Sequence, residues 1–257
     1  PVFEITRFGG YASQVVVDLA YVFAMPASLT FEQAAALPTV YMTAWYALFE
    51  LAHPRRGAKV LVHSAAGGVG SALVQMAKRA GCEVTGVVGR TAKVAVVEAL
   101  GADHVIDKST QDLWREAEAV APQGFDVILD ANGVATLGAS YKHLRRTGKL
   151  VVYGFHSMMP KAGGKPNWPK LALDYVRTPR FNPLDMTNDS KSVLAFNLSY
   201  LFDRVDMLDE AMRDILGWIA AGELSPPAVT TYPLADVARA HADIESGTTT
   251  GKLVLVP

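Results

Sequence analysis

The segment Val60-Leu-Val-His-Ser-Ala-Ala-Gly-Gly-Val-Gly70 decides the fold of this 257-residue chain. Its first four residues have the apolar, β-branched character of a short buried strand, and a helix beginning Ser71-Ala-Leu-Val-Gln follows the glycines. A glycine-rich turn between a strand and a helix is the fingerprint of a dinucleotide-binding unit. In that pattern Ala65 takes the first position, Gly67 lets the backbone approach a pyrophosphate, and Gly70 lets the helix pack closely on the strand.

Strands alternate with helices around this turn, from residue 59 to residue 155. Strands separated by roughly 10 to 20 helical residues form βαβ units with right-handed crossovers. We therefore predict an α/β fold with a doubly wound parallel sheet, a Rossmann fold. The predicted strands are Lys59–His63, Glu83–Val88, His104–Ile106, Phe125–Asp130 and Gly148–Tyr153.

The segments outside this alternation carry weaker signals. Tyr11–Val17 is β-branched and predicts a short strand, and a hydroxyl at Ser28 or Thr30 caps a helix that Pro38 should end. From His156 to Pro183 no periodicity persists, which predicts a surface loop. Further along we expect a strand over Ser192–Tyr200, helices over Asp206–Ala221 and Leu234–Ser246, and a terminal strand over Lys252–Val256.

Composition narrows the class of protein. Half of the residues are apolar, so the chain can bury a large core, and 24 basic against 25 acidic residues leave a net charge of -1. No overall field draws such a chain to nucleic acid, and no apolar run is long enough to span a membrane. The single cysteine, Cys82, predicts a reducing, cytoplasmic location. Because the chain begins with Pro1 in a strand-rich region, we expect further residues before it.

The end of the second predicted strand predicts the cofactor. A carboxylate there would accept the 2′-hydroxyl of NAD, but the sequence reads Val88-Gly89-Arg90-Thr91-Ala92-Lys93, with two cations and no acid. The alternative is that Arg90 and Lys93 are only solvated charges at the start of a helix, where cations oppose the helix dipole. An anionic partner removes that conflict, so we expect NADPH.

Other polar residues leave alternatives open. His63 suits a hydrogen-bonded core position more than a ligand contact, and Cys82 suits a buried apolar filler. Asp130 and Asn132 lie where a strand meets its loop, and they could support the backbone or contact a ligand. No His, Cys, Asp or Glu set has the spacing of a metal site, so no metal is expected, and no catalytic residue is named.

The chain resembles the medium-chain dehydrogenase/reductase superfamily, in its zinc-free quinone oxidoreductase branch, which includes zeta-crystallin. Within the branch, His63 and the segment Phe196–Leu201 resemble the vesicle amine transport protein homologues. The resemblance covers essentially the whole chain. The matching motifs are Leu37-Pro38, Thr43–Leu48, Val60–Gly70, Gly101–Asp107, Gly148 with Gly154, Arg239–His241 and Gly251–Val254.

The resemblance implies a set of NADPH-binding residues. Ala66, Gly67, Gly68 and Val69 match the pyrophosphate turn, and Gly89, Arg90 and Lys93 match the 2′-phosphate pocket, where Lys108 replaces a common tyrosine. The residues matching the nicotinamide side and the end of the cofactor site are Thr43, Asn132, Gly154, Phe155, Phe196, Leu198 and Lys252.

The resemblance also implies how the chain is divided into domains and which reaction the protein catalyses. Residues 1–39 match the end of a GroES-like catalytic domain, residues 40–204 the NADPH-binding domain, and residues 205–257 a return to the catalytic domain; relatives have more residues in front. We expect zinc-independent hydride transfer from NADPH to a quinone or an α,β-unsaturated carbonyl. The alternatives are an enoyl-thioester reductase and a non-catalytic NADPH-binding or membrane-associating adaptor. We also expect a homodimer, formed through the apolar edge strand at Ser192–Ser199.

Overall fold

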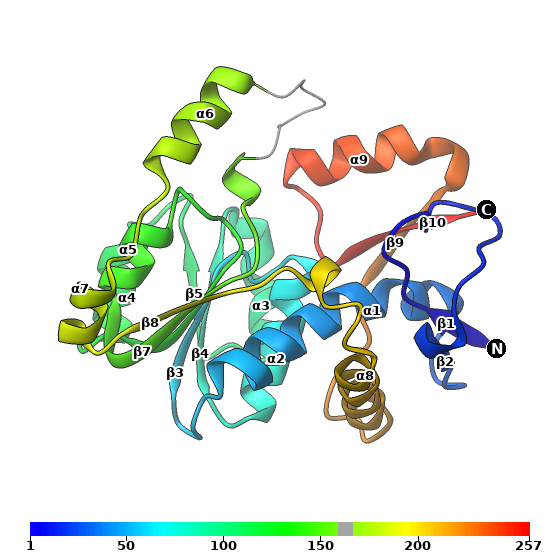
Figure 1. The fold of residues 1–257 in the computed structure, drawn as a ribbon, viewed down its shortest axis with the longest axis horizontal. Helices are drawn as coiled ribbons and strands as arrows, with labels where there is room; N and C mark the ends of the chain where they lie inside the picture. The colour runs from blue at the N-terminus through cyan, green and yellow to red at the C-terminus, as the bar shows by residue number, and fades with distance from the viewer. Residues whose placement is uncertain (159–166) are drawn as a thin grey trace.

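A parallel sheet of six strands forms the centre of the computed structural model, which describes residues 1–158 and 167–257 (Figure 1). The strand order is β5-β4-β3-β6-β7-β8, so the chain runs outward from β3 and then returns to the other side of it. Every neighbouring pair is parallel, which confirms the predicted doubly wound fold. The strands are β3 (Lys59–Val62), β4 (Glu83–Val88), β5 (His104–Asp107), β6 (Phe125–Asp130), β7 (Leu144–Val152) and β8 (Ser192–Ala195).

Helices cover both faces of the sheet because alternate strand residues point to opposite sides. Val60 and Val62 belong to one buried cluster with α2, α1 (Phe31–Trp45) and α8 (Val205–Ala220). Leu61 between them belongs to a second cluster with α4 and α5. The helices that cross between strands are α2 (Gly68–Arg79), α3 (Val94–Ala99), α4 (Leu113–Val120) and α5 (Leu137–Lys142).

Helix α1 (Phe31–Trp45) runs past the proline that was expected to end it. Thr30 caps it, with Gln33 completing a capping box, but Pro38 lies inside the helix instead of ending it. Past Trp45 the helix continues without a break as a π-helix over Tyr46–Ala52. The predicted break was wrong because almost every residue after Ala36 in α1 is buried, and this packing offsets the hydrogen bond that Pro38 cannot donate.

Small elements flank the main sheet. β1 (Val2–Glu4) pairs with β2 (Val22–Ala24), and β9 (Val229–Pro233) pairs in parallel with β10 (Lys252–Val256). The strand expected at Tyr11–Val17 does not form: those residues lie exposed without a partner strand, and a strand needs pairing to persist. Helices α8 (Val205–Ala220) and α9 (Val237–Ser246) complete the C-terminal segment.

The stretch expected to be a loop from His156 to Pro183 contains a short 3-10 helix (His156–Met158) and helix α6, and helix α7 begins at its last residue. Residues 159–166 lie beyond the described part. α6 (Trp168–Arg177) begins after the cap Asn167, and α7 (Pro183–Asp189) begins after the cap Asn182. Each Asn-capped start has a proline in its first turn, a position that favours helices, so the predicted loop was wrong there.

The expected strand at Ser192–Tyr200 is shorter than predicted. β8 ends at Ala195, and Leu198–Tyr200 forms a short 3-10 helix. As predicted, β8 is at the edge of the sheet. Across the described ranges, no helix combines the length and the apolar character that a membrane crossing requires.

Candidate functional site

The glycine-rich turn joins β3 to α2 at the carboxyl edge of the sheet. An added Cβ at Gly70 would lie 2.2 Å from the Ser64 carbonyl oxygen, so only glycine fits there. At Gly68 an added Cβ would lie 2.9 Å from Val40 Cγ1. Gly67 is the N-cap of α2 and no side chain caps this helix, which leaves backbone N–H groups and the positive end of the helix dipole at the turn.

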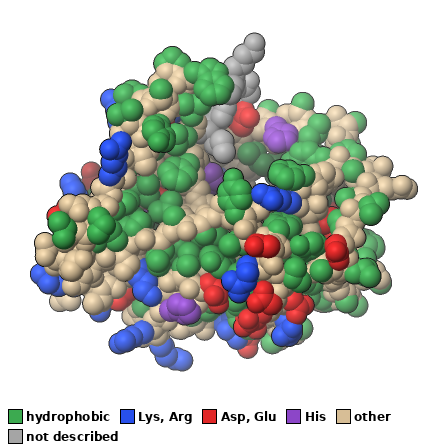
Figure 2. Space-filling view, viewed as in Figure 1, with side chains coloured by type: hydrophobic (Ala, Val, Ile, Leu, Met, Phe, Trp, Pro, Cys, Tyr) green, Lys and Arg blue, Asp and Glu red, His purple; other side chains and the backbone are tan. Residues whose placement is uncertain are grey.

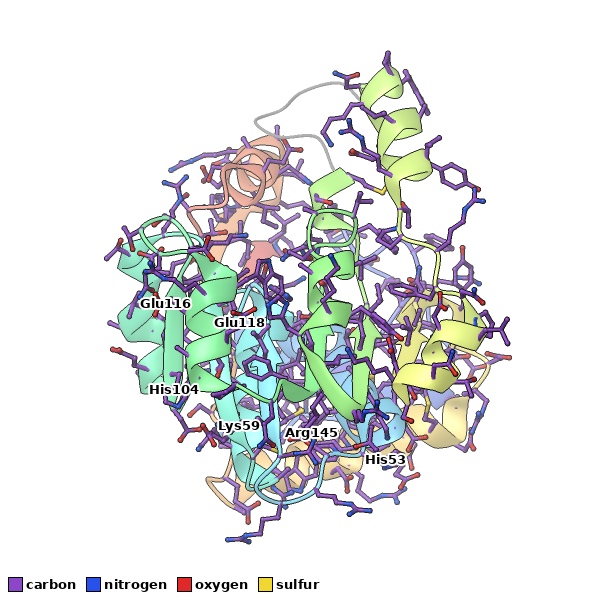
Figure 3. The ribbon with its side chains drawn as sticks, turned by 90° about the vertical axis from the view of Figure 1, so that its left-hand side faces the viewer. His53, Lys59, His104, Glu116, Glu118 and Arg145 are labelled. Atoms are coloured by element: carbon purple, nitrogen blue, oxygen red, sulfur yellow. The ribbon has the colours of Figure 1, made fainter. Side chains whose placement is uncertain are left out.

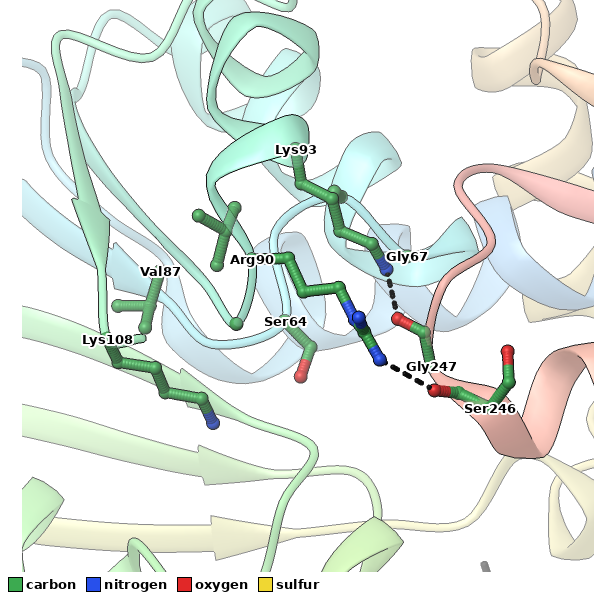
Figure 4. A pocket seen from close by; sticks show the side chains of 11 residues that line it. Ser64, Gly67, Val87, Arg90, Lys93, Lys108, Ser246 and Gly247 are labelled. Carbon is green, nitrogen blue, oxygen red and sulfur yellow. Dashed lines mark hydrogen bonds between the residues drawn. The ribbon is translucent and has the colours of Figure 1, made fainter. Parts of the chain in front are cut away.

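A pocket of about 240 Å³ opens beside this turn (Figure 4). It spans the ends of β3, β4 and β5, together with the C-terminal end of α9. Six of the predicted cofactor residues line it, so residues far apart in the sequence meet in one pocket. The lining residues are Ser64, Ala66, Gly67, Val87, Val88, Gly89, Arg90, Lys93, Lys108, Ser246 and Gly247.

Three cations and no carboxylate line the pocket within the described part of the chain. Lys93 Nζ donates to the carbonyl oxygens of Gly247 (2.9 Å) and Thr249 (2.6 Å), and Arg90 Nη2 donates to that of Ser246 (3.2 Å). Partial burial, and then the charge of Arg90, lower the pKa of Lys93. Lys108 is exposed, and no ion pair or hydrogen bond to another described residue engages its ammonium group.

Asp107 holds the cationic turn in place from outside the pocket. Its carboxylate accepts hydrogen bonds from Thr91 Oγ1 (2.6 Å) and from the backbone N–H of Ser109 (2.9 Å). These bonds, led by one from the Ser109 hydroxyl, lower the pKa of Asp107. The acid therefore links the turn after β4 to the end of β5, which fixes Arg90 and Lys93 opposite Lys108.

A buried polar network lies under the turn, where β3 and β6 adjoin and the strand order reverses. Asp130 accepts from the backbone N–H groups of Asn132 (2.8 Å) and Gly133 (3.0 Å), and from Ser140 Oγ (3.0 Å). Of the two roles left open for Asp130, the structure shows backbone support. His63 is fully buried and 3.1 Å from Ser140 Oγ, as expected for a core histidine.

The environment of His63 keeps it neutral. Burial lowers the pKa of His63 to about 4, although the nearby Asp130 carboxylate acts in the opposite direction. Asn132 connects this network to the turn, because its Oδ1 accepts from Ser64 Oγ at 3.0 Å. Its Nδ2 is buried and has no partner among the described residues, so it is a donor available to a ligand at this edge.

The loops after β6 and β7 run side by side on the far side of the turn. The Asn132 carbonyl accepts from Ser157 N (2.9 Å), and Gly133 lies against Phe155, where an added Cβ would come within 2.5 Å of the ring. Gly154 packs on Ala131. Asn132, Gly154 and Phe155 therefore lie together, next to the pocket but not in its lining.

The remaining predicted residues are not gathered at the pocket. Thr43 is buried in α1 and donates to the Thr39 carbonyl (2.6 Å), and Phe196 packs on the Tyr46 ring at 4.7 Å between centroids. Leu198 is in the hydrophobic core, and Val69 packs against it. Lys252 lines a separate groove of about 520 Å³ between α1, β1, α9 and β10, and burial lowers the pKa of Lys252.

Sequence reasoning missed the contribution of the C-terminal segment to the pocket. Ser246 and Gly247 line it, 156 and 154 residues from the cations that bond to their carbonyl oxygens. The only local signal was the helix end at Ser246-Gly247, where glycine takes the left-handed conformation with φ of 66°. Nothing in that signal says which strand end the turn will meet.

Charged side chains form ion pairs at the opposite edge of the sheet, where the strands begin (Figure 3). Lys59 and His104 both lie 3.2 Å from the Glu83 carboxylate, and Arg145 lies 3.2 Å from that of Asp126. Lys59 and Arg145, near the amino ends of their strands, are thus paired with acids. Arg90 and Lys93 at the carboxyl ends bond to carbonyl groups, and Lys108 has no partner among the described residues.

Comparisons with known proteins agree with this geometry. Residues 100–255 match the family described as zinc-binding dehydrogenase, which is more than half of the chain. This chain belongs to the medium-chain dehydrogenase/reductase superfamily. It has the quinone oxidoreductase-like fold of that superfamily. The described residues nevertheless contain no group of three or more His, Cys, Asp or Glu side chains placed to hold a metal ion.

Three similar proteins illustrate the relationship. The synaptic vesicle membrane protein VAT-1 homolog of Danio rerio is 33% identical over 99% of this chain and 52% of its own length. The structure of a Pseudomonas syringae quinone oxidoreductase is 29% identical, with a TM-score of 0.83 over 100% of this chain and 74% of the other. That of the Escherichia coli quinone oxidoreductase complexed with NADPH is 27% identical, with a TM-score of 0.80 over 96% and 72%. The chain thus spans about half the length of the VAT-1 relative.

Proposed function

We propose that this dehydrogenase/reductase uses NADPH to reduce a quinone or an α,β-unsaturated carbonyl compound. The observation that carries the proposal is the pocket at the glycine-rich turn, where Arg90, Lys93 and Lys108 converge without a carboxylate. Three cations suit a 2′-phosphate, whereas an acid there would favour the 2′-hydroxyl of NAD. The solved Escherichia coli relative, complexed with NADPH, supports the same cofactor.

The structure fits the phosphate groups of this cofactor at two places. The pyrophosphate would lie at the uncapped N-terminus of α2, where Gly67 is the N-cap and the first backbone N–H groups of the helix are free to donate. The 2′-phosphate would lie in the pocket with Arg90, Lys93 and Lys108. Lys108 has no described partner, whereas Arg90 and Lys93 already bond to carbonyl groups of the C-terminal segment.

When bound, NADPH supplies the hydride, and the protein supplies position and an environment with little water. Asn132, held by Ser64 and by its backbone bond to Asp130, offers its free Nδ2 donor beside the loop of Gly154 and Phe155. The contact between Phe155 and Gly133 keeps these two loops together. This arrangement would orient the reactive half of the cofactor at the carboxyl ends of β6 and β7.

Fluorescence titration with NADPH and NADH tests the cofactor. We expect NADPH to bind at least about tenfold more tightly, since charge-assisted phosphate contacts are worth more than neutral ones. Stopped-flow oxidation of bound NADPH by 1,4-quinones, compared with crotonyl thioesters, then separates a quinone reductase from an enoyl-thioester reductase. Equal dissociation constants for the two cofactors would contradict the proposal.

One observation supports the adaptor as a second candidate. Helix α6 buries none of its residues and exposes Trp168 (74%), Tyr175 (76%) and Val176 (73%), and Figure 2 shows hydrophobic side chains gathered over it. Exposed aromatic side chains of this kind occur where a helix meets a membrane surface or a partner. Liposome co-sedimentation that is lost in Trp168→Ser, without quinone-dependent oxidation of NADPH, would favour the adaptor. The sequence from Met158 to Lys170, where apolar residues alternate with cations, favours such a surface, but residues 159–166 lie outside the described residues.

We also propose a homodimer formed through β8. This strand is the last in the sheet order, so the backbone groups on its outer side face no neighbouring strand of the described sheet. Two copies related by a two-fold axis would continue the sheet and close the interface. Ala195→Pro should weaken the dimer by removing a backbone donor. Light scattering that shows a monomer at micromolar concentration, or a dimer unaffected by this proline, would refute the interface.

A further inference from the structure

The C-terminal end of α9 lies against the cations of the phosphate pocket (Figure 4). Lys93 Nζ donates to the Gly247 and Thr249 carbonyl groups, at 2.9 and 2.6 Å, and Arg90 Nη2 donates to the Ser246 carbonyl at 3.2 Å. A helix C-terminus carries partial negative charge on its free carbonyl groups, so these contacts are electrostatically favourable. The two cations are therefore fixed by a segment remote in sequence.

These contacts leave donors over for a ligand. A lysine ammonium has three N–H donors and an arginine guanidinium has five. Lys93 uses two of them on carbonyl groups and Arg90 is bonded through Nη2, so both can still donate to a phosphate without leaving α9. Fixing a long cationic side chain costs rotamer entropy, and here the fold has already fixed both side chains.

The turn that supplies the carbonyl groups is itself ordered by local bonds. Ser246 Oγ donates to the Asp243 carbonyl (2.6 Å) and accepts from the backbone N–H of Thr248 (3.1 Å). Gly247 has a φ of 66°, a conformation that residues with a Cβ rarely adopt. The orientation of the Gly247 carbonyl thus depends on the residue being glycine.

We propose that the turn Ser246–Thr249 sets the specificity of this protein for a 2′-phosphate, by holding Arg90 and Lys93 in position for it. This inference rests on the proposed use of NADPH. Ser246 and Gly247 are positioning residues: they act through the two cations and need not touch the cofactor. A ligand that lacks the 2′-phosphate makes no use of these cations, so its affinity should not depend on the turn.

Gly247→Val tests the proposal, because a β-branched residue disfavours positive φ and would reorient the carbonyl group that binds Lys93. Gly222→Val is the matched control. Gly222 also follows a helix with positive φ (72°) and also has nothing within 4 Å of an added Cβ, but it follows α8 and does not line the pocket. Ser246→Ala is a milder variant of the same turn if Gly247→Val fails to fold.

Isothermal titration of the full chain with adenosine 2′,5′-bisphosphate and adenosine 5′-monophosphate gives the readout, with thermal unfolding as the check on folding. We expect the preference of the unmodified chain for the bisphosphate to fall at least about fivefold in Gly247→Val, with monophosphate affinity kept within about twofold. Gly222→Val should keep the preference. Equal loss in both variants, or no loss in Gly247→Val and Ser246→Ala, would overturn the role of the turn. If the unmodified chain shows no preference, the proposed cofactor is wrong.

Discussion

Replacing Gly70 with alanine should disable the glycine-rich turn. The new Cβ would lie 2.2 Å from the Ser64 carbonyl oxygen and 2.8 Å from Ala65 Cα, and both of these atoms are backbone. Neither can rotate away, so α2 and the turn must separate by roughly 1 Å to reach an ordinary contact distance, at a cost of about 1–3 kcal/mol or more. A displacement of about 1 Å in a binding site can cost about a hundredfold in function. We expect NADPH affinity to fall at least about tenfold.

Gly217→Ala is the control, and it should change the free energy of unfolding in the opposite direction. Gly217 lies inside α8, and an added Cβ there has nothing within 4 Å. Alanine in a helix interior is favoured over glycine, so this variant should gain about 0.5–1 kcal/mol in the free energy of unfolding and bind NADPH unchanged. Urea unfolding and fluorescence titration measure both quantities. If Gly70→Ala unfolds and binds NADPH like the unmodified chain, the close approach inferred for the turn is wrong.

Three further predictions concern pKa values and the phosphate pocket. Burial lowers the pKa of His63 to about 4, so below about pH 6.5 the unfolded state binds more protons than the folded state. The free energy of unfolding should not depend on this group above that pH and should fall by up to about 3 kcal/mol towards pH 4. Urea titrations should show a smaller loss in His63→Gln. Burial, followed by the Asp126 charge, raises the pKa of Cys82 to about 11. This thiol should therefore resist Ellman's reagent at pH 8 until the chain unfolds. Rapid labelling of the native protein would contradict the burial of Cys82. Lys108→Gln should weaken NADPH binding about tenfold and leave NADH binding unchanged, and an equal loss for both cofactors would show that Lys108 does not contact the 2′-phosphate.

Features that depend on residues close together in the sequence were predicted correctly. The turn at Gly67–Gly70 is encoded by the steric room its backbone needs, and the alternation of apolar strands with helices specifies that the strands of the sheet run parallel. His63 and Cys82 were placed in the core because an isolated polar or thiol side chain beside an apolar strand is more often buried than functional. Each of these inferences needs only residues within one βαβ unit.

Predictions that relied on prolines and β-branched residues were wrong where tertiary packing outweighed local propensity. Pro38 is tolerated inside α1 because the helix is buried on several sides, and Pro183 begins α7 instead of preventing a helix. The β-branched run before Val17 forms no strand because no other strand lies alongside it. Local propensity is worth a few tenths of a kcal/mol per residue, which long-range burial and pairing exceed.

The residue types at the phosphate pocket follow from the sequence, since Arg90 and Lys93 stand where an acid would select NAD. The tertiary structure decided which hydrogen-bond partners those residues have. Lys93 bonds to carbonyl groups 154 and 156 residues away, while Lys108 has no described partner, although all three cations line one pocket. Pairing between a side chain and a distant helix end depends on how α9 packs over the sheet, and no pattern within a few residues of either partner encodes that placement.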